Sequence, residues 1–322
     1  KALKLYPDNP DFLYQKARIL YELVKYEKAI VSIEKAIELR PDNPDFWHAR
    51  GLVLCKIFDH KQEMFAYDQA ITAFDKELEL RPNDSDAWVA KGIVFYDWEK
   101  YSNALECFNE TIKINADSAF AWYYKGKTLS DMDEIQEAIQ CFGKAVIFSP
   151  NFSYAWQEKG NLHEKLGQYD KAVDCYDKVI KNNDFGLSMW LQKGSALAML
   201  DKHEEAIACY DRVTEQIPYD VDAWRNKAES FVNLGQHQKA LLCYDITVDS
   251  ICAQIANPFI KANDQYVTKM KHLAIICCEK MIEIDQNFVV AWFRKSLFLS
   301  SLGRLEESKM CDKKITELRS RL

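Results

Sequence analysis

Apolar residues recur along most of the chain at intervals of three and four positions, which is the periodicity of amphipathic helices. In residues 156–189 a first apolar run starts at Trp156 and is interrupted at Gly167, and a second run starts at Tyr169 and reaches Val179. This pattern of two short runs separated by a glycine predicts two short antiparallel helices.

The same pattern recurs between residues 88 and 240 with a period of 34 residues. The segments WVAKG, WYYKG, WQEKG, WLQKG and WRNKA begin at positions 88, 122, 156, 190 and 224, and an alanine follows each tryptophan after sixteen residues. Self-similarity at a fixed period of this length indicates an array of stacked units, in which each unit buries its apolar face against its neighbours.

Several features of the repeat resemble those of the tetratricopeptide repeat family. They are the tryptophan, the small residue four positions later, the tetrapeptides YEKA, YDQA, YSNA and YDKA at positions 26, 67, 101 and 169, and a set of closing prolines at Pro7, Pro41, Pro82, Pro150 and Pro218. The resemblance covers nearly the whole chain. It implies an all-α, right-handed superhelical solenoid of antiparallel helix pairs, with a concave groove lined by the first helices and the activity of holding partner proteins.

Stepping the repeat along the sequence predicts the organisation of the chain. Residues 1–9 correspond to the end of a preceding repeat helix, residues 10–319 to a single solenoid of about nine helix pairs, and residues 320–322 to a tail. Because residue 1 is Lys and a helix is already under way there, we expect the chain to be a fragment of a longer protein.

Two units depart from the regular spacing. In residues 44–84 the distance from Trp47 to Ala70 is 23 residues, so seven residues are added; these equal two helical turns, and both helices can lengthen with their buried faces in phase. The unit at about 253–288 is degenerate, because Pro258 stands where the tryptophan is expected. A proline inside a helix costs about 3 kcal/mol, so we expect Pro258 at a helix start.

The charge balance and the motif content exclude several classes of protein. The 42 basic and 49 acidic residues give a net charge of −7, which argues against nucleic acid or an anionic membrane as a partner. No apolar run approaches the roughly 20 residues of a membrane span. The sequence contains no HExxH, CxxC pair, glycine-rich phosphate loop or GxSxG motif, so we predict no catalytic site, metal or cofactor. His203 and His237 replace a tyrosine of the turn and are expected to pack.

Seven of the ten cysteines also follow the 34-residue period; they are Cys107, Cys141, Cys175, Cys209, Cys243, Cys277 and Cys311. Equivalent atoms of neighbouring units lie roughly 8 to 10 Å apart, whereas a disulfide needs Cα atoms within about 7 Å. We therefore expect buried packing thiols rather than disulfides. Unpaired thiols are typical of a reducing compartment, which predicts a cytoplasmic protein.

A basic residue stands three positions after each tryptophan site, and many units carry an acid 21 positions after it. The bases are Lys16, Arg50, Lys91, Lys125, Lys159, Lys193, Lys227, Lys261 and Lys295; the acids are Glu34, Asp75, Asp177, Asp211, Asp245 and Glu279. We expect ion pairs between the two helices of a unit, interrupted at Asn109, Gly143 and Lys313. The alternative is a basic stripe that binds an acidic partner.

In the family that this chain resembles, residues at fixed offsets from the tryptophan face the concave groove. Aromatic side chains gather at these offsets in three successive units, which predicts a binding site for a partner protein or extended peptide composed of Tyr96, Phe120, Tyr123, Tyr124, Lys127, Tyr154, Gln157 and Asn161. Exposed aromatics beside polar groups are typical of protein interfaces. The alternative is that Phe120 and Tyr154 only pack between units.

Two specialised sites of the family do not match these offsets. The carboxylate clamp that binds chaperone tails needs a Lys where this chain has Gln157, and the asparagine row of the sugar-transferring enzymes is represented only by Asn226. We therefore expect a non-enzymatic interaction scaffold or adaptor, with replacement of Tyr123 and Tyr154 abolishing partner capture without unfolding.

Two other roles stay open. The first is the recognition or self-assembly arm of a larger multidomain enzyme or regulator. The second is formation of a homo-oligomer through the irregular C-terminal repeats, where apolar surface is expected at Phe259, Ile260, Tyr266, Phe293 and Leu297.

Overall fold

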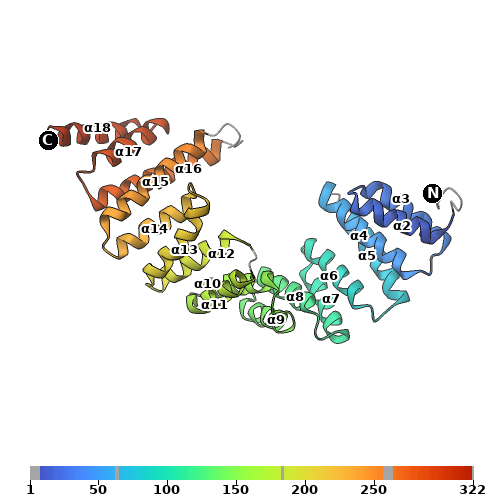
Figure 1. Cartoon of the computed structure of the whole chain (residues 1–322). Coiled ribbons are helices and arrows are strands. Elements are labelled where there is room, and N and C mark those ends of the chain that lie inside the picture. The colour runs from blue at the N-terminus through green and yellow to red at the C-terminus, as the bar shows by residue number, and fades with distance from the viewer. Residues whose placement is uncertain (1–7, 62–64, 183–184, 257–263, 321–322) are drawn as a thin grey trace. The chain divides into compact units, whose positions relative to one another are not determined.

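The computed structural model of the chain describes residues 8–61, 65–182, 185–256 and 264–320. Within these residues the chain forms seventeen α-helices and no β-strand. Figure 1 labels these helices along the chain. The all-α fold expected from the repeat pattern is confirmed. Residues 1–7 and the expected helix start at Pro258 lie outside the described residues.

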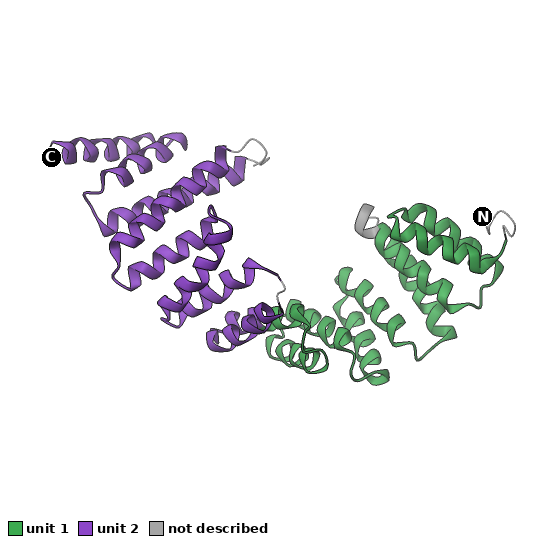
Figure 2. Ribbon diagram, viewed as in Figure 1, with its two compact units in different colours: residues 1–159 green, residues 160–322 purple. Residues whose placement is uncertain are grey.

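The helices fall into two compact units, residues 1–159 and 160–322, which are coloured separately in Figure 2. The first unit contains α2 (Pro10–Glu22), α3 (Tyr26–Leu39), α4 (Pro44–Lys61), α5 (Phe65–Leu80), α6 (Ser85–Asp97), α7 (Tyr101–Ile114), α8 (Ala119–Asp131) and α9 (Ile135–Phe148). The boundary between the units falls inside α10 (Ser153–Lys165). The second unit contains α11 (Tyr169–Lys181), α12 (Leu187–Met199), α13 (His203–Gln216), α14 (Val221–Asn233), α15 (His237–Ala256), α16 (Asp264–Ile284), α17 (Val289–Ser301) and α18 (Leu305–Arg319).

Within each unit the helices pack in sequence order. In the first unit α6 packs against α7 and α8 against α9, and α7 then packs against α8, so each pair contacts the next. The same order holds for α12 to α15 in the second unit. Each described unit is thus a stack of helix pairs, which is the arrangement of a solenoid.

Polar side chains begin several of the first helices. The Asp84 carboxylate accepts hydrogen bonds from the backbone N–H groups of Asp86 and Ala87, and Asp220 accepts one from Ala223 at 2.7 Å. These bonds satisfy N–H groups that have no partner within the helix. The turns that precede several first helices therefore contain their own start signal, whereas α12 and α17 begin without a side-chain cap.

A glycine in four of the five regular first helices lies against an aromatic ring of the second helix in the same pair, whereas α14 has Ala228 at this position. A Cβ atom at Gly126 would lie 2.9 Å from the ring of Phe142, and one at Gly194 would lie 2.5 Å from the ring of Tyr210. Such distances are shorter than a van der Waals contact. The glycine thus makes room for a fully buried aromatic ring.

In six repeats the tryptophan is hydrogen-bonded to the turn before its helix. Its indole Nε1–H donates a hydrogen bond to the backbone carbonyl six residues earlier, in the pairs Trp47–Pro41, Trp88–Pro82, Trp122–Ala116, Trp156–Pro150, Trp224–Pro218 and Trp292–Gln286, at 2.7 to 3.0 Å. In these six repeats the tryptophan is therefore part of the scaffold, because it fixes the turn that leads into its helix.

The basic residues pair with acids in a different register from the one expected. Lys91 lies 2.6 Å from Asp75, and Lys193 lies 2.6 Å from Asp177; further pairs are Arg50–Glu34, Lys227–Asp211 and Lys295–Glu279. Each acid lies on the second helix of one pair and each base on the first helix of the next. The ion pairs therefore join consecutive repeats. This corrects the prediction that they join the two helices of one repeat.

Two of the three positions without an acid, Asn109 and Gly143, show what replaces the ion pair. Lys125 donates a hydrogen bond to the Asn109 side chain at 2.7 Å, and Lys159 lies over the indole ring of Trp156 at 5.2 Å. Gly143 stands at the acid position for Lys159. Lys261 lies outside the described residues. The paired lysines are half-buried in these contacts. This favours a role in packing between repeats over the alternative of a basic stripe that binds an acidic partner.

The cysteines that follow the repeat period are buried thiols. Burial raises the pKa of Cys107, Cys141, Cys209 and Cys243 to about 11. The thiolate is the reactive form of cysteine, so these residues are chemically inert packing groups at neutral pH. This agrees with the packing role expected from their spacing.

The irregular units contain the longer helices. In the unit of residues 44–84, α4 and α5 have 18 and 16 residues, compared with 13 and 14 for α6 and α7. Near the C-terminus α15 has 20 residues and α16 has 21. Both irregularities are thus accommodated by helix extension.

Candidate partner-binding surface

Three tyrosines of α6 and α8 surround the ammonium group of Lys127. The Lys127 Nζ atom lies 4.9 Å from the ring centroid of Tyr96, 5.9 Å from that of Tyr124 and 6.0 Å from that of Tyr123. Cations are attracted to the faces of aromatic rings at such distances. Lys127 therefore holds the three rings together at the point where two successive first helices meet.

Tyr96 is held in place at its hydroxyl end as well. Its O–H donates a hydrogen bond of 2.6 Å to the carboxylate of Asp131 at the end of α8. Burial and this hydrogen bond raise the pKa of Tyr96 well above its usual range. The hydroxyl therefore stays protonated, and it joins α6 to α8.

Tyr123 is a packing residue. It is 8% exposed, and its ring centroid lies 4.9 Å from Phe152, 5.8 Å from Phe142 and 5.3 Å from Tyr124. Burial raises the pKa of its hydroxyl. Because the Tyr123 ring packs against its aromatic neighbours, replacing it would disturb the fold. A Tyr123 variant is therefore not expected to lose partner capture selectively.

Phe120 and Tyr154 are the exposed aromatics of this surface. Phe120 is 61% exposed and Tyr154 is 56% exposed, although Phe120 also contacts Phe152 with a centroid distance of 5.2 Å. The two residues occupy the same repeat position, two before Trp122 and Trp156. Packing between repeats therefore covers only part of the Phe120 ring. The exposed surfaces of Phe120 and Tyr154 are both available to a partner.

Contacts join most of the expected site residues into one surface in the first unit. We call the aromatic face the set Tyr96, Phe120, Tyr123, Tyr124, Lys127 and Tyr154. Gln157 is half-buried on the same helix as Tyr154. Asn161 belongs to the second unit, where it accepts a hydrogen bond from the Tyr176 hydroxyl at 3.1 Å; it is a neighbour of that buried ring.

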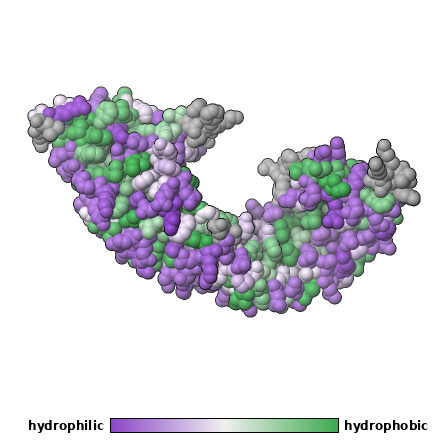
Figure 3. Space-filling model, in the orientation of Figure 1, coloured by the Kyte–Doolittle hydropathy of each residue, from purple (hydrophilic) through white to green (hydrophobic). Residues whose placement is uncertain are grey.

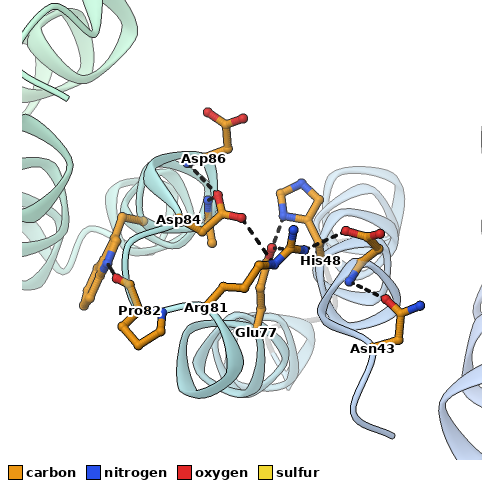
Figure 4. Close-up of polar contacts among 10 residues, drawn as sticks. Asn43, His48, Glu77, Arg81, Pro82, Asp84 and Asp86 are labelled. Carbon is orange, nitrogen blue, oxygen red and sulfur yellow. Dashed lines mark hydrogen bonds and ion pairs between the residues drawn. The ribbon is translucent and has the colours of Figure 1, made fainter. Parts of the chain in front are cut away.

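A polar cluster in the lengthened unit was not expected from the sequence. Glu77 is 1% exposed, and its carboxylate lies 2.9 Å from Nδ1 of His48 and 3.5 Å from Arg81. Arg81 also lies 3.6 Å from Asp84 and 2.7 Å from Asp45. Figure 4 shows His48, Glu77, Arg81 and Asp84 converging. Each charge of the cluster therefore has an opposite charge beside it, which a buried carboxylate requires.

Comparing repeat positions could have revealed this cluster. The position of Glu77 is occupied in the following units by Thr111, Ala145 and Val179, which are small or apolar. Burial lowers the pKa of His48, but the hydrogen bond to Glu77 and the charges of Glu77, Asp84 and Asp86 outweigh it and raise the pKa above its usual value. The charged form of His48 is thus favoured beside Glu77.

The described part of the chain offers little basis for other chemistry. No group of three or more His, Cys, Asp or Glu residues in it is arranged to hold a metal ion. No helix among the described residues has the length and apolar content of a membrane span. On the face drawn in Figure 3, hydrophobic patches alternate with hydrophilic ones over both units.

Comparison with known families and structures agrees with this architecture. Families described as tetratricopeptide repeats match residues 153–184 and 187–230, a TPR repeat family matches residues 17–57, and the family of anaphase-promoting complex, cyclosome, subunit 3 matches residues 63–145. The curated proteins searched contain no match.

Several solved structures have a similar fold. YrrB, a TPR protein with an unusual peptide-binding site, has 23% identity over 55% of this chain and 92% of its own, with a TM-score of 0.52. PilF of Pseudomonas aeruginosa has 18% identity over 68% of this chain and 97% of its own, with a TM-score of 0.56. PilW, a type IV pilus biogenesis factor, has 16% identity over 66% and 96%, with a TM-score of 0.55.

The fold and the repeat matches together define an all-α solenoid of the protein-interaction class. The chain belongs to the tetratricopeptide repeat family.

Proposed function

We propose that the chain is a non-enzymatic scaffold that holds an extended segment of a partner protein on the aromatic face. The observation that carries this proposal is the pair of exposed rings, Phe120 and Tyr154, at equivalent positions of successive units. Large aromatic side chains contribute most of the binding energy in many protein interfaces. Here they stand on a support of buried rings that is already ordered, so little conformational entropy is lost on binding.

The polar neighbours of the two rings suit an extended segment. Lys127, Asp131 and Gln157 lie on the same helices as the aromatic face, and such groups can hydrogen-bond the main chain of a bound peptide. The rings then bury side chains of the peptide, and the polar groups set its direction.

The test is partner capture from the native cell, followed by mass spectrometry. We expect the double variant Phe120→Ala with Tyr154→Ala to lose the captured partner while keeping its helical content and melting temperature. The control is Ile147→Ala on α9, which removes a 69% exposed apolar side chain from a second helix. Equal loss of partner in the control and the double variant would contradict the proposal.

The competing role is that of a recognition arm of a larger enzyme or regulator, whose catalytic part would lie elsewhere in the protein. The full-length reading frame distinguishes the two roles directly. We also propose a reducing, cytoplasmic location, because the buried cysteines are thiols.

Self-association is a second candidate, and one observation favours it. Val290, Phe293 and Leu297 are 43%, 49% and 54% exposed along α17, and they line an apolar cavity of about 650 Å³ with Ile255 of α15. Phe259 and Ile260 lie outside the described residues. Light scattering at two protein concentrations tests this candidate; a mass that stays at that of one chain at both would exclude it.

A further inference from the structure

The row of exposed rings on the aromatic face continues into an acid. Phe120 and Tyr154 stand two positions before the tryptophans of two successive repeats, and Asp86 stands at the same position of the preceding repeat. Asp86 lies in the first turn of α6 and is exposed. Equivalent positions of neighbouring repeats lie roughly 8 to 10 Å apart. A segment that crosses the two rings therefore also reaches the Asp86 carboxylate.

The Asp86 carboxylate lacks the partner that its equivalents have. In the two preceding repeats the corresponding acid is paired with an arginine, as Asp11–Arg40 at 3.0 Å and Asp45–Arg81 at 2.7 Å. In the next repeat Asn115 stands where these arginines stand. Among the described residues the Asp86 carboxylate has no ion pair or hydrogen bond of its own. It is therefore open to a cation from a partner.

The nearest titratable group to Asp86 does not take up this charge. Burial lowers the pKa of His48, while Glu77 and, more weakly, Asp86 raise it. The His48 ring lies 2.9 Å from Glu77, a carboxylate that is 1% exposed. The charge of His48 is thus matched by Glu77, and Asp86 acts on it only from a distance.

A second carboxylate stands beside the exposed ring at the other end of the row. Glu158 and Tyr154 are four residues apart on α10, so their side chains lie on one face of the helix, one turn apart. Burial and, after it, the charge of Glu158 raise the pKa of the Tyr123 hydroxyl, which places this carboxylate near the aromatic face. The part of the chain that the structure describes gives the Glu158 carboxylate no ion pair or hydrogen bond.

The other charged groups beside the tyrosines balance one another. The Lys127 ammonium lies among three tyrosine rings, and Asp131 accepts a tyrosine hydrogen bond of 2.6 Å. Burial raises the pKa of Tyr124, Asp97 raises it further and Lys56 opposes this increase. Asp86 and Glu158 therefore leave the aromatic face negative, with one acid at each end of the row.

We propose that the aromatic face binds an extended segment of a partner protein in which two basic residues flank an apolar one. One basic side chain meets Asp86, the apolar side chain covers Phe120, and the other basic side chain lies between the Tyr154 ring and the Glu158 carboxylate. Cations are attracted to aromatic faces as well as to carboxylates. The inference rests on the proposed function and specifies the chemistry of its partner.

The spacing of the basic residues follows from the spacing of the repeats. An extended chain advances by about 3.3 Å per residue, so three residues cover the roughly 8 to 10 Å between equivalent positions of neighbouring repeats. The expected pattern is a basic residue, an apolar residue three positions later and a second basic residue three positions after that.

The probe is the fluorescein-labelled peptide Lys-Gly-Ser-Leu-Gly-Ser-Lys-amide, titrated into the intact chain and followed by fluorescence anisotropy. The matched peptide has norleucine in place of both lysines, so it keeps the apolar stems and loses the charges. We expect the lysine peptide to bind about tenfold more tightly at low salt, and the difference to shrink as salt screens the charges. Equal affinities, or no saturable binding of the lysine peptide, would overturn the proposal.

Variants of single acids separate the aromatic face from the negative charge of the whole chain. Asp86→Asn and Glu158→Gln should each weaken binding of the lysine peptide about threefold. The control Glu137→Gln removes an equal charge from an exposed position of α9 and should leave the affinity unchanged. Equal weakening by Glu137→Gln would assign the attraction to net charge and overturn the proposal.

Capture of the native partner distinguishes this inference from the function on which it rests. If the double variant of Phe120 and Tyr154 loses the partner while Asp86→Asn with Glu158→Gln keeps it, the scaffold function stands and a basic segment is excluded. Loss of the partner in both double variants, with melting temperatures unchanged, is the result that we expect.

Discussion

At the scale of single residues, the glycine that several first helices share contributes to packing, although its low helix propensity would weaken the helix. Glycine weakens a helix interior by about 1 kcal/mol relative to alanine. At Gly126 a larger residue would clash, because the ring of Phe142 occupies the space in which a Cβ would lie. The second helix supplies Gly143 as a contrast, because a Cβ there would meet only Lys159 Nζ at 4.0 Å.

The two glycines should therefore respond in opposite directions to the same substitution. Gly126→Ala is expected to lower the free energy of unfolding by about 1 to 3 kcal/mol through overpacking. Gly143→Ala is expected to raise it by up to about 1 kcal/mol through helix propensity. Urea unfolding followed by circular dichroism measures both, and a stabilising Gly126→Ala would contradict the packing argument.

The scale of helices explains why the ion pairs were expected in the wrong register. The spacing of acids and bases shows only that they recur with the repeat, and it does not distinguish a partner in the same unit from one in the next. Contacts decide this: Lys193 reaches back sixteen residues to Asp177 because the second helix of one pair packs against the first helix of the next. These ion pairs contribute to the packing of each repeat against the next.

The lengthened pair α4 and α5 should make stability depend on pH. The pKa of His48 is raised in the folded chain by Glu77 and nearby carboxylates, so its charged form stabilises the fold. That contribution is complete below the unfolded-state pKa of about 6.5 and is lost as the pH rises through the folded-state value.

We therefore expect the melting temperature of the wild type, relative to that of His48→Gln, to fall as the pH rises above about 6.5. Thermal unfolding of both proteins across the neutral range measures the difference. Glu77→Gln should remove most of the pH dependence, since it removes the partner charge. A difference between wild type and His48→Gln that is independent of pH would contradict the assigned pairing.

At the scale of the whole molecule, the period of 34 residues was sufficient to predict the fold. Trp, Gly, Ala and Cys recur because the helices of successive repeats pack in the same way. The recurrence in the sequence is therefore enough to predict the class of fold. The candidate surface was less predictable. Tyr123 and Phe120 both follow groove offsets, yet one is 8% exposed and the other is 61% exposed.

The difference between these two residues arises from contacts that repeat position does not encode. Phe152, in the turn before α10, lies beside both rings, and it covers Tyr123 while leaving most of Phe120 open. Glu77 differs from its equivalents in the following repeats, but its burial becomes visible only in the structure. The repeat predicts the scaffold, and the deviations from it determine the surface.

The central claim is that the aromatic face holds the partner, and hydrogen exchange of the chain with and without its captured partner tests it most directly. Backbone amides of α8 (Ala119–Asp131) and of residues 153–159 should gain protection in the complex, while those of α7 (Tyr101–Ile114) and α9 (Ile135–Phe148) should not change. Protection confined to α7 and α9 would contradict the account.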